Sequence, residues 1–240
     1  MREFVSPDSH YADLGSGDPR TILSWATVTI DRLAVATSFQ SSGLVILHML
    51  REIRPDLPVL FLDTGFHFPE TLEFRERVAE MWDLKLVDLR GDHGSVEGQT
   101  ETYGPELYRR DPDKCCFINK VKPLQDALEE YDGWISGLRR DQSPLRAETP
   151  IVEAQLLPSG SEVLKIHPLA GWARDDVDDY IDRFEIPTNP LLERGFASIG
   201  CAPCTRSVSN GEGERAGRWE GLAKTECGIH TFGRRSEAEQ

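Results

Sequence analysis

Arg32-Leu33-Ala34-Val35-Ala36-Thr37, followed by Ser38-Phe39-Gln40-Ser41-Ser42-Gly43, is the stretch of sequence that decides the fold. The first six residues are apolar enough to form a strand that is buried on both faces. Small and polar residues then predict a turn, and an apolar helical pattern runs from Leu44 through Leu50. A strand, a small-residue turn and a helix N-terminus can together bind an anion, because backbone N–H groups and the positive end of the helix dipole converge there.

The turn itself matches no common phosphate-binding motif. It contains one glycine and lacks both the Gly-Lys-Ser/Thr ending of a Walker loop and the G-x-G-x-x-G spacing of a dinucleotide site. An ordinary connection between a strand and a helix therefore remains the alternative to an anion site. In the anion-binding interpretation, the hydroxyl groups of Ser38, Ser41 and Ser42 face the phosphate.

The alternation of strand and helix continues downstream. A strand is predicted at 58–62, ending in Asp63-Thr64-Gly65, followed by a helix at 69–82 and a strand at 85–89. Strands separated by helices of this length form right-handed βαβ units, so we predict an α/β fold with a parallel sheet. Ligands of such sheets bind at the carboxyl ends of the strands, where 38–43 and 63–65 both fall.

The second half of the chain adds further strands and then changes in character. A strand at 133–138 delivers Arg139-Arg140 at its carboxyl end, and another is predicted at 163–167. Helices are expected at about 104–110, from Cys115 to about 130 with a bend or restart at Pro123, and at 173–184. Residues 207–240 hold too few apolar side chains for a core of their own, so we predict either a disordered tail or a lid on a domain formed by 1–206.

The charge of the chain limits its partners. With 240 residues it is long enough for one substantial domain, and its formal net charge of −14 argues against non-specific nucleic-acid binding. No apolar run reaches membrane-spanning length and the N-terminus has no signal-peptide core, so a cytoplasmic protein is expected. Small basic clusters stand out in this acidic chain, although a solvated surface is their ordinary explanation; they are Lys120 with Lys122, Arg139-Arg140 with Arg146, and Arg215 with Arg218.

Four of the five cysteines form two pairs. Cys201-Ala202-Pro203-Cys204 is a C-x-x-C turn, which points both sulfur atoms into the same space. Cys115-Cys116 is a vicinal pair, and neighbouring side chains diverge too far to suit one small tetrahedral ion. An iron–sulfur cluster is wider than one ion and can accept adjacent ligands. Zinc, a redox disulfide and unrelated buried thiols remain the alternatives.

The fifth cysteine stands alone in Glu226-Cys227-Gly228-Ile229-His230. A free thiol has a pKa near ~8.5 and is mostly protonated at neutral pH, so a nucleophilic cysteine needs nearby cations. Arg139, Arg215, Arg218 and His230 are the candidates for this charge. An idle surface thiol is the alternative.

Several motifs in this order resemble the assimilatory iron–sulfur adenylyl-sulfate reductases, relatives of the phosphoadenylyl-sulfate reductases. The resemblance covers most of the chain from about Ala34 to His230. It rests on Ser38-Phe39-Gln40, Leu62-Asp63-Thr64-Gly65, Cys115-Cys116 with Lys120-Val121-Lys122-Pro123-Leu124, Ser136-Gly137-Leu138-Arg139-Arg140, Ile186-Pro187-Thr188-Asn189-Pro190-Leu191, Ile199-Gly200-Cys201-Ala202-Pro203-Cys204-Thr205 and Glu226-Cys227-Gly228-Ile229-His230.

The resemblance implies a Rossmann-like PP-loop domain of the adenine nucleotide alpha hydrolase type, with a mobile C-terminal tail that carries the catalytic cysteine. Cys227 is then the nucleophile that forms an S-sulfocysteine and releases AMP, and thioredoxin or a glutaredoxin-like dithiol releases sulfite. It also implies a [4Fe–4S] cluster on Cys115, Cys116, Cys201 and Cys204. The residues expected to bind adenylyl sulfate are Ser38, Gln40, Ser41, Asp63, Thr64, Gly65, Lys120, Arg139, Arg140, Arg215, Arg218 and His230.

The sequence departs from the family pattern at two places. Asn119 stands where the family usually has arginine, and Gln40-Ser41-Ser42-Gly43 replaces the commoner Ser-Gly-Ala-Glu-Asp loop. The rival functions are reduction of 3′-phosphoadenylyl sulfate, a metal-stabilised nucleotide-binding module without catalysis, and a PP-loop ATP pyrophosphatase or tRNA-thiolating enzyme. The sequence leaves open whether the protein is a homo-oligomer.

Overall fold

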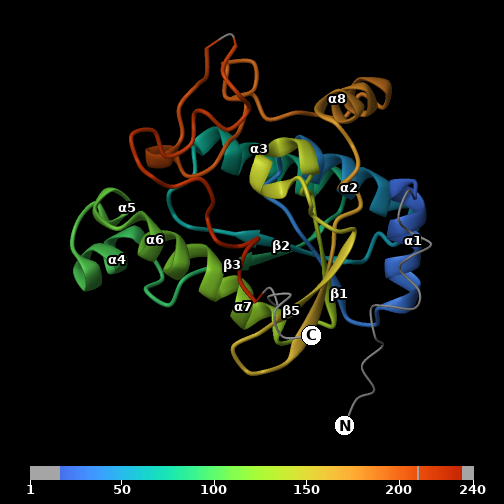
Figure 1. The fold of residues 1–240 in the computed structure, drawn as a ribbon, viewed down its shortest axis with the longest axis horizontal. Coiled ribbons are helices and arrows are strands. Elements are labelled where there is room, and N and C mark those ends of the chain that lie inside the picture. Colours follow the sequence, from blue (N-terminus) through green and yellow to red (C-terminus); the bar gives the residue numbers. More distant parts are fainter. Residues whose placement is uncertain (1–16, 210, 234–240) are drawn as a thin grey trace.

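The protein is described by a computed structural model for residues 17–209 and 211–233, so the start of the polar N-terminal segment and the end of the predicted tail lie outside the described residues. A six-stranded sheet with the order β3-β2-β1-β4-β6-β5 runs through the centre (Figure 1). Its strands are β1 (Leu33–Ala36), β2 (Pro58–Leu62), β3 (Lys85–Leu89), β4 (Gly133–Ser136), β5 (Val152–Leu156) and β6 (Glu162–Ile166). All pairs are parallel except β5 with β6, which confirms the predicted α/β class.

Helices and the C-terminal segment cover the two faces of the sheet. One face packs against α1 (Pro19–Thr29), α2 (Ser41–Ile53), α3 (Pro69–Met81) and α8 (Arg174–Arg183). The opposite face packs against α7 (Lys122–Leu128) and the segment around Phe232. The remaining short elements are α4 (Val96–Tyr103), α5 (Leu107–Arg110), α6 (Pro112–Cys116), a π-helical turn (Phe117–Val121) and the 3₁₀ turns Arg140–Gln142, Pro144–Arg146 and Ala202–Cys204.

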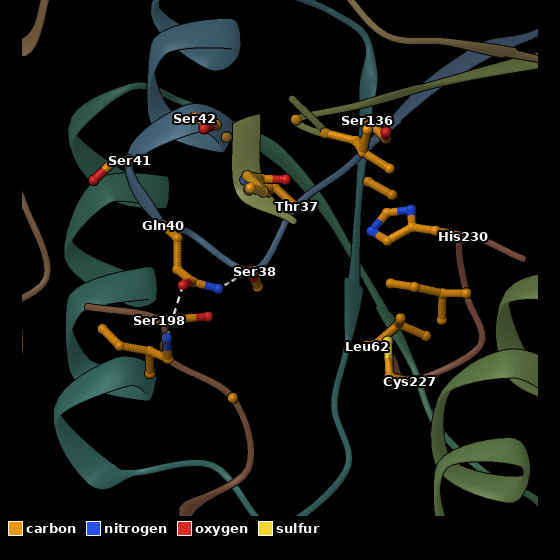
Figure 2. A pocket seen from close by; sticks show the side chains of 18 of the residues that line it. Thr37, Ser38, Gln40, Ser41, Ser42, Leu62, Ser136, Ser198, Cys227 and His230 are labelled. Carbon is orange, nitrogen blue, oxygen red and sulfur yellow. Dashed lines mark hydrogen bonds between the residues drawn. The ribbon is translucent and has the colours of Figure 1, made fainter. Parts of the chain in front are cut away.

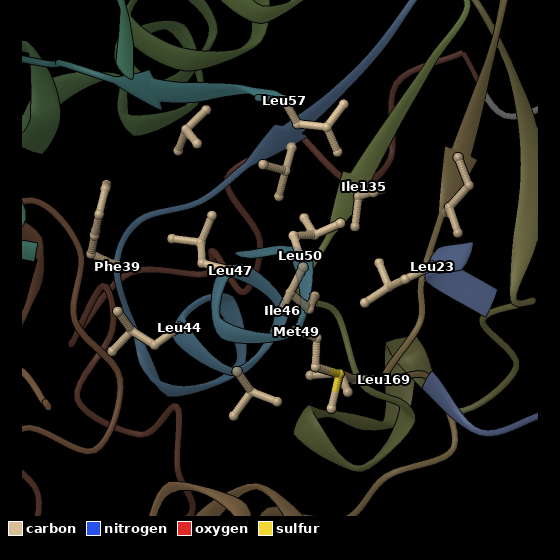
Figure 3. Close-up of a cluster of buried hydrophobic side chains, with 14 of the residues drawn as sticks. Leu23, Phe39, Leu44, Ile46, Leu47, Met49, Leu50, Leu57, Ile135 and Leu169 are labelled. Carbon is tan, nitrogen blue, oxygen red and sulfur yellow. The ribbon is translucent and has the colours of Figure 1, made fainter. Parts of the chain in front are cut away.

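The core follows from the alternation of side chains along the strands. Leu33 and Val35 of β1 face the helix layer of α2, whereas Ala34 between them faces α7. Helix α2 is buried along most of its apolar length, and its leucines fill the space under the sheet (Figure 3). Burial of this kind contributes about 25 cal/mol per Å² of apolar surface, so α2 is held mainly by packing.

The turn after β1 contains a residue with an unusual backbone. Phe39 has φ 55°, a left-handed conformation that costs a non-glycine residue about 1 kcal/mol. Its side chain is fully buried and meets Phe61 edge-on with ring centroids 5.9 Å apart, which offsets that cost. Gly43 is needed nearby, because a Cβ there would lie 2.1 Å from the Thr37 hydroxyl. The turn therefore holds the loop and the start of α2 in one fixed shape.

The predicted helix from Cys115 to about 130 is confirmed, with an irregularity in its middle. Helices α6 and α7 are joined by the π-helical turn Phe117–Val121. Pro123 follows this turn and has no N–H to donate to the carbonyl of Asn119, so the wider turn accommodates a residue that an unbroken α-helix disfavours.

Strand β5 was not among the predicted strands. It alternates polar and apolar residues, and its polar side chains Glu153 and Gln155 point into the interior instead of to solvent. Glu153 pairs with the fully buried Lys165 at 3.1 Å, and Gln155 accepts a hydrogen bond from the Trp134 indole at 3.1 Å. Strand prediction depends on apolar side chains on the buried face. Here the buried face carries polar side chains that find their partners only in the folded sheet, so the pattern does not indicate a strand.

The described part of the tail lies against the domain. Trp219 N–H donates to the carbonyl of Cys204, and further on Leu156 N–H of β5 donates to the carbonyl of Gly233. Phe232 packs in the core on the α7 side of the sheet, so the tail runs from the cysteine segment back to β5 (Figure 1). The described tail residues, 207–209 and 211–233, therefore lie docked on the domain in this structure. Within residues 17–209 and 211–233, no helix has the length and apolarity needed to cross a membrane.

Candidate active site

A deep cleft opens at the carboxyl ends of β1 and β4. From β1 the chain continues to β2 and β3 on one side of the sheet, and β4 then lies on the other side of β1. The order in which strands are added therefore reverses between β1 and β4. The cleft has about 1380 Å³ of empty space including its open mouth, and it is lined by residues 36–38, 40–43 and 136–139 among others. The cleft therefore lies at the strand ends where the sequence predicted the ligand site (Figure 2).

The loop after β1 is tied to the cysteine segment. Gln40 Nε2 donates to Ser38 Oγ at 2.8 Å, and its Oε1 accepts the backbone N–H of Ile199 at 2.8 Å (Figure 2). Ser38, Gln40 and Ser41 all line the cleft. The amide of Gln40 thus holds two walls of the cleft together in addition to facing its interior.

Two arginines in the segment that follows β4 form buried ion pairs with the tail. Arg139 is 1% exposed and donates to Ser42 Oγ at 2.6 Å and to Glu214 at 3.0 Å. Arg146 donates through two nitrogen atoms to Glu226, at 2.9 and 2.7 Å. A bidentate arginine–carboxylate pair fixes the orientation of both groups. Because Glu226 is fixed in this way, Cys227, the next residue in the chain, is held in place as well.

The tail adds its own cations to the cleft. Arg215 Nη2 lies 3.3 Å from Glu226, and the guanidinium of Arg218 stacks over Trp219 at 4.5 Å. Burial, assisted by Arg146, lowers the pKa of Arg215 from its usual value, but an arginine stays charged at neutral pH. Both arginines line the cleft, which therefore has a cationic wall inside an acidic protein.

Cys227 and His230 lie on the same wall of the cleft, opposite the loop after β1 (Figure 2). The His230 ring stacks on Trp134 with an interplanar angle of 8°. Burial lowers the pKa of His230 well below its ordinary value, and the nearby cations Lys165, Arg146 and Arg215 act in the same direction. The prediction that His230 supplies positive charge is therefore wrong in this conformation, because the docked ring is neutral at pH 7.

The depressed pKa of His230 predicts a pH-dependent tail. A free histidine titrates near 6.5, so below about pH 6.5 the undocked tail binds a proton that the docked tail excludes. The docking equilibrium keeps its full strength above this pH and weakens as pH falls, by up to about ten-fold per pH unit. Hydrogen exchange at the Phe232 amide, corrected for its intrinsic pH dependence, should accelerate between pH 7.5 and pH 5.5. The same experiment on His230→Gln should show no such acceleration, and equal protection of the wild type at both pH values would contradict the assignment.

A second, smaller hollow of about 350 Å³ adjoins the cleft. It is lined by Cys115, Cys116, Cys201 and Cys204, all of them free thiols. Burial raises the pKa of Cys115 to about 12 and that of Cys116 to about 11. Within the described residues no three His, Cys, Asp or Glu side chains are grouped closely enough to hold a single metal ion.

Lys120 lies between the two cavities and lines both. Burial by itself would lower the pKa of this amine, but the sulfur atoms of Cys201, Cys227 and Cys116 outweigh burial and raise it. Burial likewise opposes ionisation of Cys201, yet Lys120 and the hydroxyl of Thr64, which is 3.3 Å from the sulfur, lower the pKa of that thiol. Lys120 is therefore a cation shared by the thiols and the cleft.

Four of the residues predicted to bind substrate do not line the cleft. Asp63 accepts two hydrogen bonds from Arg90, and Gly65 donates its N–H to Asp63. Thr64 contacts Cys201 of the thiol hollow. Arg140 donates to the carbonyl of Thr149, which turns its side chain away from the cleft. The remaining eight predicted substrate residues and Cys227 are brought together in the cleft; the eight are Ser38, Gln40, Ser41, Lys120, Arg139, Arg215, Arg218 and His230.

The cleft also contains side chains that sequence reasoning did not assign to the site. Arg146, Arg174 and His67 line it although they belong to no recognised motif. Arg146 carried a weak signal, because it is part of the basic cluster after the fourth predicted strand. For His67 the sequence has no signal: burial lowers its pKa, so it adds a neutral ring to the floor of the cleft.

Comparison with known proteins identifies the family of this chain. Residues 32–207 match the model of the phosphoadenosine phosphosulfate reductase domain. The adenosine 5′-phosphosulfate reductase of Streptomyces coelicolor is 46% identical over 210 residues, covering 87% of this chain and 86% of the relative. That of Halalkalibacterium halodurans is 44% identical, covering 89% of this chain and 91% of the relative.

Solved structures give the same result for the fold. A phosphoadenylyl-sulfate reductase from Candida auris, in a phosphate complex, superposes with a TM-score of 0.73 at 30% identity, covering 85% of this chain and 99% of that one. The FMN adenylyltransferase of Candida glabrata shares the fold at 17% identity, with a TM-score of 0.58, covering 99% of this chain and 80% of that one. The family that the motifs predicted is confirmed, and the chain belongs to the phosphoadenosine phosphosulfate reductase family.

Proposed function

We propose that this protein reduces adenylyl sulfate to sulfite and AMP in sulfate assimilation leading to cysteine. The observation that carries the proposal is the position of Cys227, a free thiol in a cleft with a cationic wall at the strand ends of a nucleotide-binding fold. Relatives more than 40% identical over most of this chain are adenosine 5′-phosphosulfate reductases by name. An anionic nucleotide and a thiol nucleophile are the two reactants that such a cleft accommodates.

The chemistry proceeds in two displacements. The Cys227 thiolate attacks the sulfur atom of the sulfate group, an S–S bond forms, and the bond from that sulfur to the phosphate oxygen breaks. AMP leaves with the electron pair, and Cys227 carries an S-sulfonate. A dithiol protein then attacks the Cys227 sulfur and displaces sulfite, and its second thiol resolves the mixed disulfide, so the dithiol supplies both electrons.

The residues around the cleft supply position and charge. Arg139, Arg215 and Arg218 bind the phosphate and sulfate oxygens, and Ser38 with the start of α2 provides the hydroxyl and backbone N–H donors. In the described conformation Glu214 and Glu226 accept from Arg139 and from Arg146. When the substrate binds, its oxygens therefore take the place of tail carboxylates as hydrogen-bond acceptors of the arginines. This exchange fits a tail, residues 207–240, that moves between nucleotide and reductant as a unit distinct from 1–206.

The four thiols of the smaller hollow fit a [4Fe–4S] cluster. Their donor set is all sulfur, they line one hollow from two distant segments, and a buried lysine offsets the negative charge that bound thiolates bring. Cys115, Cys116, Cys201 and Cys204 would hold the cluster. When bound, it supplies structural and electrostatic support, since the dithiol provides the electrons.

The reductant and the compartment follow from the thiols. An S-sulfonate is opened by an exposed dithiol of low pKa, which is the chemistry of thioredoxin or a glutaredoxin-like protein. Five free cysteines fit a reducing compartment, which supports our proposal that the activity is cytoplasmic.

The test is sulfite release by anaerobically purified protein with thioredoxin, comparing adenylyl sulfate with its 3′-phosphorylated analogue. We expect a higher kcat/KM for adenylyl sulfate and a protein that contains iron and acid-labile sulfide. The second candidate, a phosphoadenylyl-sulfate reductase, is favoured by the 30% identical Candida auris structure and predicts the opposite preference. Absence of sulfite with both nucleotides would contradict the reductase proposal.

A further inference from the structure

Asn119 is almost completely enclosed beside the thiol hollow. It is 2% exposed, lies in the π-helical turn Phe117–Val121 and lines the hollow. It follows Cys115 by four positions, so both side chains lie on the same face of this helix, about one turn apart. Its amide nitrogen is 2.9 Å from the Cys115 carbonyl oxygen and 3.6 Å from the Cys115 sulfur.

Two neighbours determine which end of the Asn119 amide faces the thiol. Its Nδ2 is 2.6 Å from Oε1 of Gln99, a side chain that is itself 2% exposed. Its Oδ1 is 3.0 Å from Nε2 of His93. The Cys115 carbonyl oxygen only accepts, so the Asn119 nitrogen faces Cys115 and its oxygen faces His93, which therefore donates from Nε2.

The hydrogen count of the amide leaves one donor for Cys115. An asparagine nitrogen carries two hydrogens, and one of them is used by Gln99. The other is shared between the carbonyl oxygen and the sulfur of Cys115. When a thiol becomes a thiolate ligand its sulfur accepts more strongly, so the balance of this shared bond moves toward the sulfur.

We infer that Asn119 is a hydrogen-bond donor to the Cys115 thiolate when the proposed cluster is bound, with Gln99 and His93 as its positioning residues. The inference rests on the proposed function, because it requires the cluster. Hydrogen bonds to ligand sulfur stabilise the thiolate and tune the cluster. At the position where the resembling family usually has arginine, this chain thus uses a neutral donor that is anchored at both ends.

The test is the rate at which iron is lost from anaerobically purified protein to an excess of chelator, followed by visible absorbance. Asn119→Leu keeps the approximate volume and removes the donor. We expect iron loss on the order of ten-fold faster than in the wild type, together with a shifted iron–sulfur stretching band in the resonance Raman spectrum. Gln99→Leu, which keeps the donor and removes one anchor, should give a smaller change in both readouts.

The matched control is Gln125→Leu, on the following helical turn and outside the residues that line the hollow. It should lose iron at the wild-type rate. If Asn119→Leu does not fold, Asn119→Asp keeps the shape and replaces the donor with an acceptor, and it should also lose iron faster. If the Asn119 variant that folds loses iron at the wild-type rate and its iron–sulfur stretching band is not shifted, this inference is overturned while the cluster proposal stands. A wild type without iron would overturn the cluster proposal and this inference with it.

Discussion

Cys227→Ser is expected to lower the rate of sulfite release by at least about 10³-fold, because loss of a nucleophile removes the reaction that the rest of the site supports. A serine hydroxyl remains protonated at neutral pH, and a sulfate ester on serine would have no S–S bond for a dithiol to open, so no sulfite is released. The side chain lines the cleft, and its neighbour Glu226 is held by Arg146 and Arg215, so the substitution leaves the tail anchored. Sulfite release with thioredoxin measures the effect.

The same variant separates chemistry from binding. Since Arg139, Arg215 and Arg218 are unchanged, we expect adenylyl sulfate to bind Cys227→Ser with a Kd close to that of the wild type. Wild-type protein mixed with adenylyl sulfate and no reductant should gain the mass of one sulfonate group on the tail peptide, and the variant should not. Thr225→Ala is a matched control in the same tail and should form the adduct. An adduct of the same mass on Cys227→Ser would show that another residue is the nucleophile.

Lys120→Met is expected to lower kcat/KM for adenylyl sulfate by about 10² to 10³-fold, the usual effect of removing one preorganised charge from a buried site. Lys120 is the cation that lines both the cleft and the thiol hollow. Methionine keeps much of its length, so the effect reports on charge. Without this amine the pKa of Cys201 loses its main lowering influence, and we also expect less iron in the purified protein.

Lys122 offers a matched control two residues further along the same helix. It is 41% exposed and pairs with Asp92 and Asp126 at the surface. Lys122→Met removes the same charge without changing the cleft and should keep wild-type kcat/KM and iron content. Equal losses in the two variants would mean that the effect comes from the net charge of the helix, and not from the position of Lys120.

Much of the fold could be predicted because it depends on local patterns. The strands that became β1 and β2 are apolar runs between turn residues, and the turn between β1 and α2 was recognised from its small residues. Strand β5 was missed for a physical reason: Glu153 and Gln155 are buried against Lys165 and Trp134, partners that are only known once the sheet is assembled.

The site was predictable where residues follow strand ends and unpredictable where distant segments meet. Ser38 and Arg139 come directly after β1 and β4, and both line the cleft. Arg146 was not assigned to the site, since its partner Glu226 is 80 residues away in the sequence. The charge state of His230 was predicted wrongly, because it is set by burial against Trp134 that only tertiary structure reveals.

The docking of the tail on β5 has a consequence for solubility. Strand β5 is at the edge of the sheet, and edge strands expose backbone groups that can pair with another chain. In this structure the Leu156 N–H is satisfied by Gly233, and a side chain at Gly233 would lie 2.2 Å from the Leu156 carbonyl oxygen, so the tail covers this edge at close range. The tail therefore occupies a backbone position on the outer edge of β5, at Leu156, that would otherwise be available for pairing with a strand of another chain.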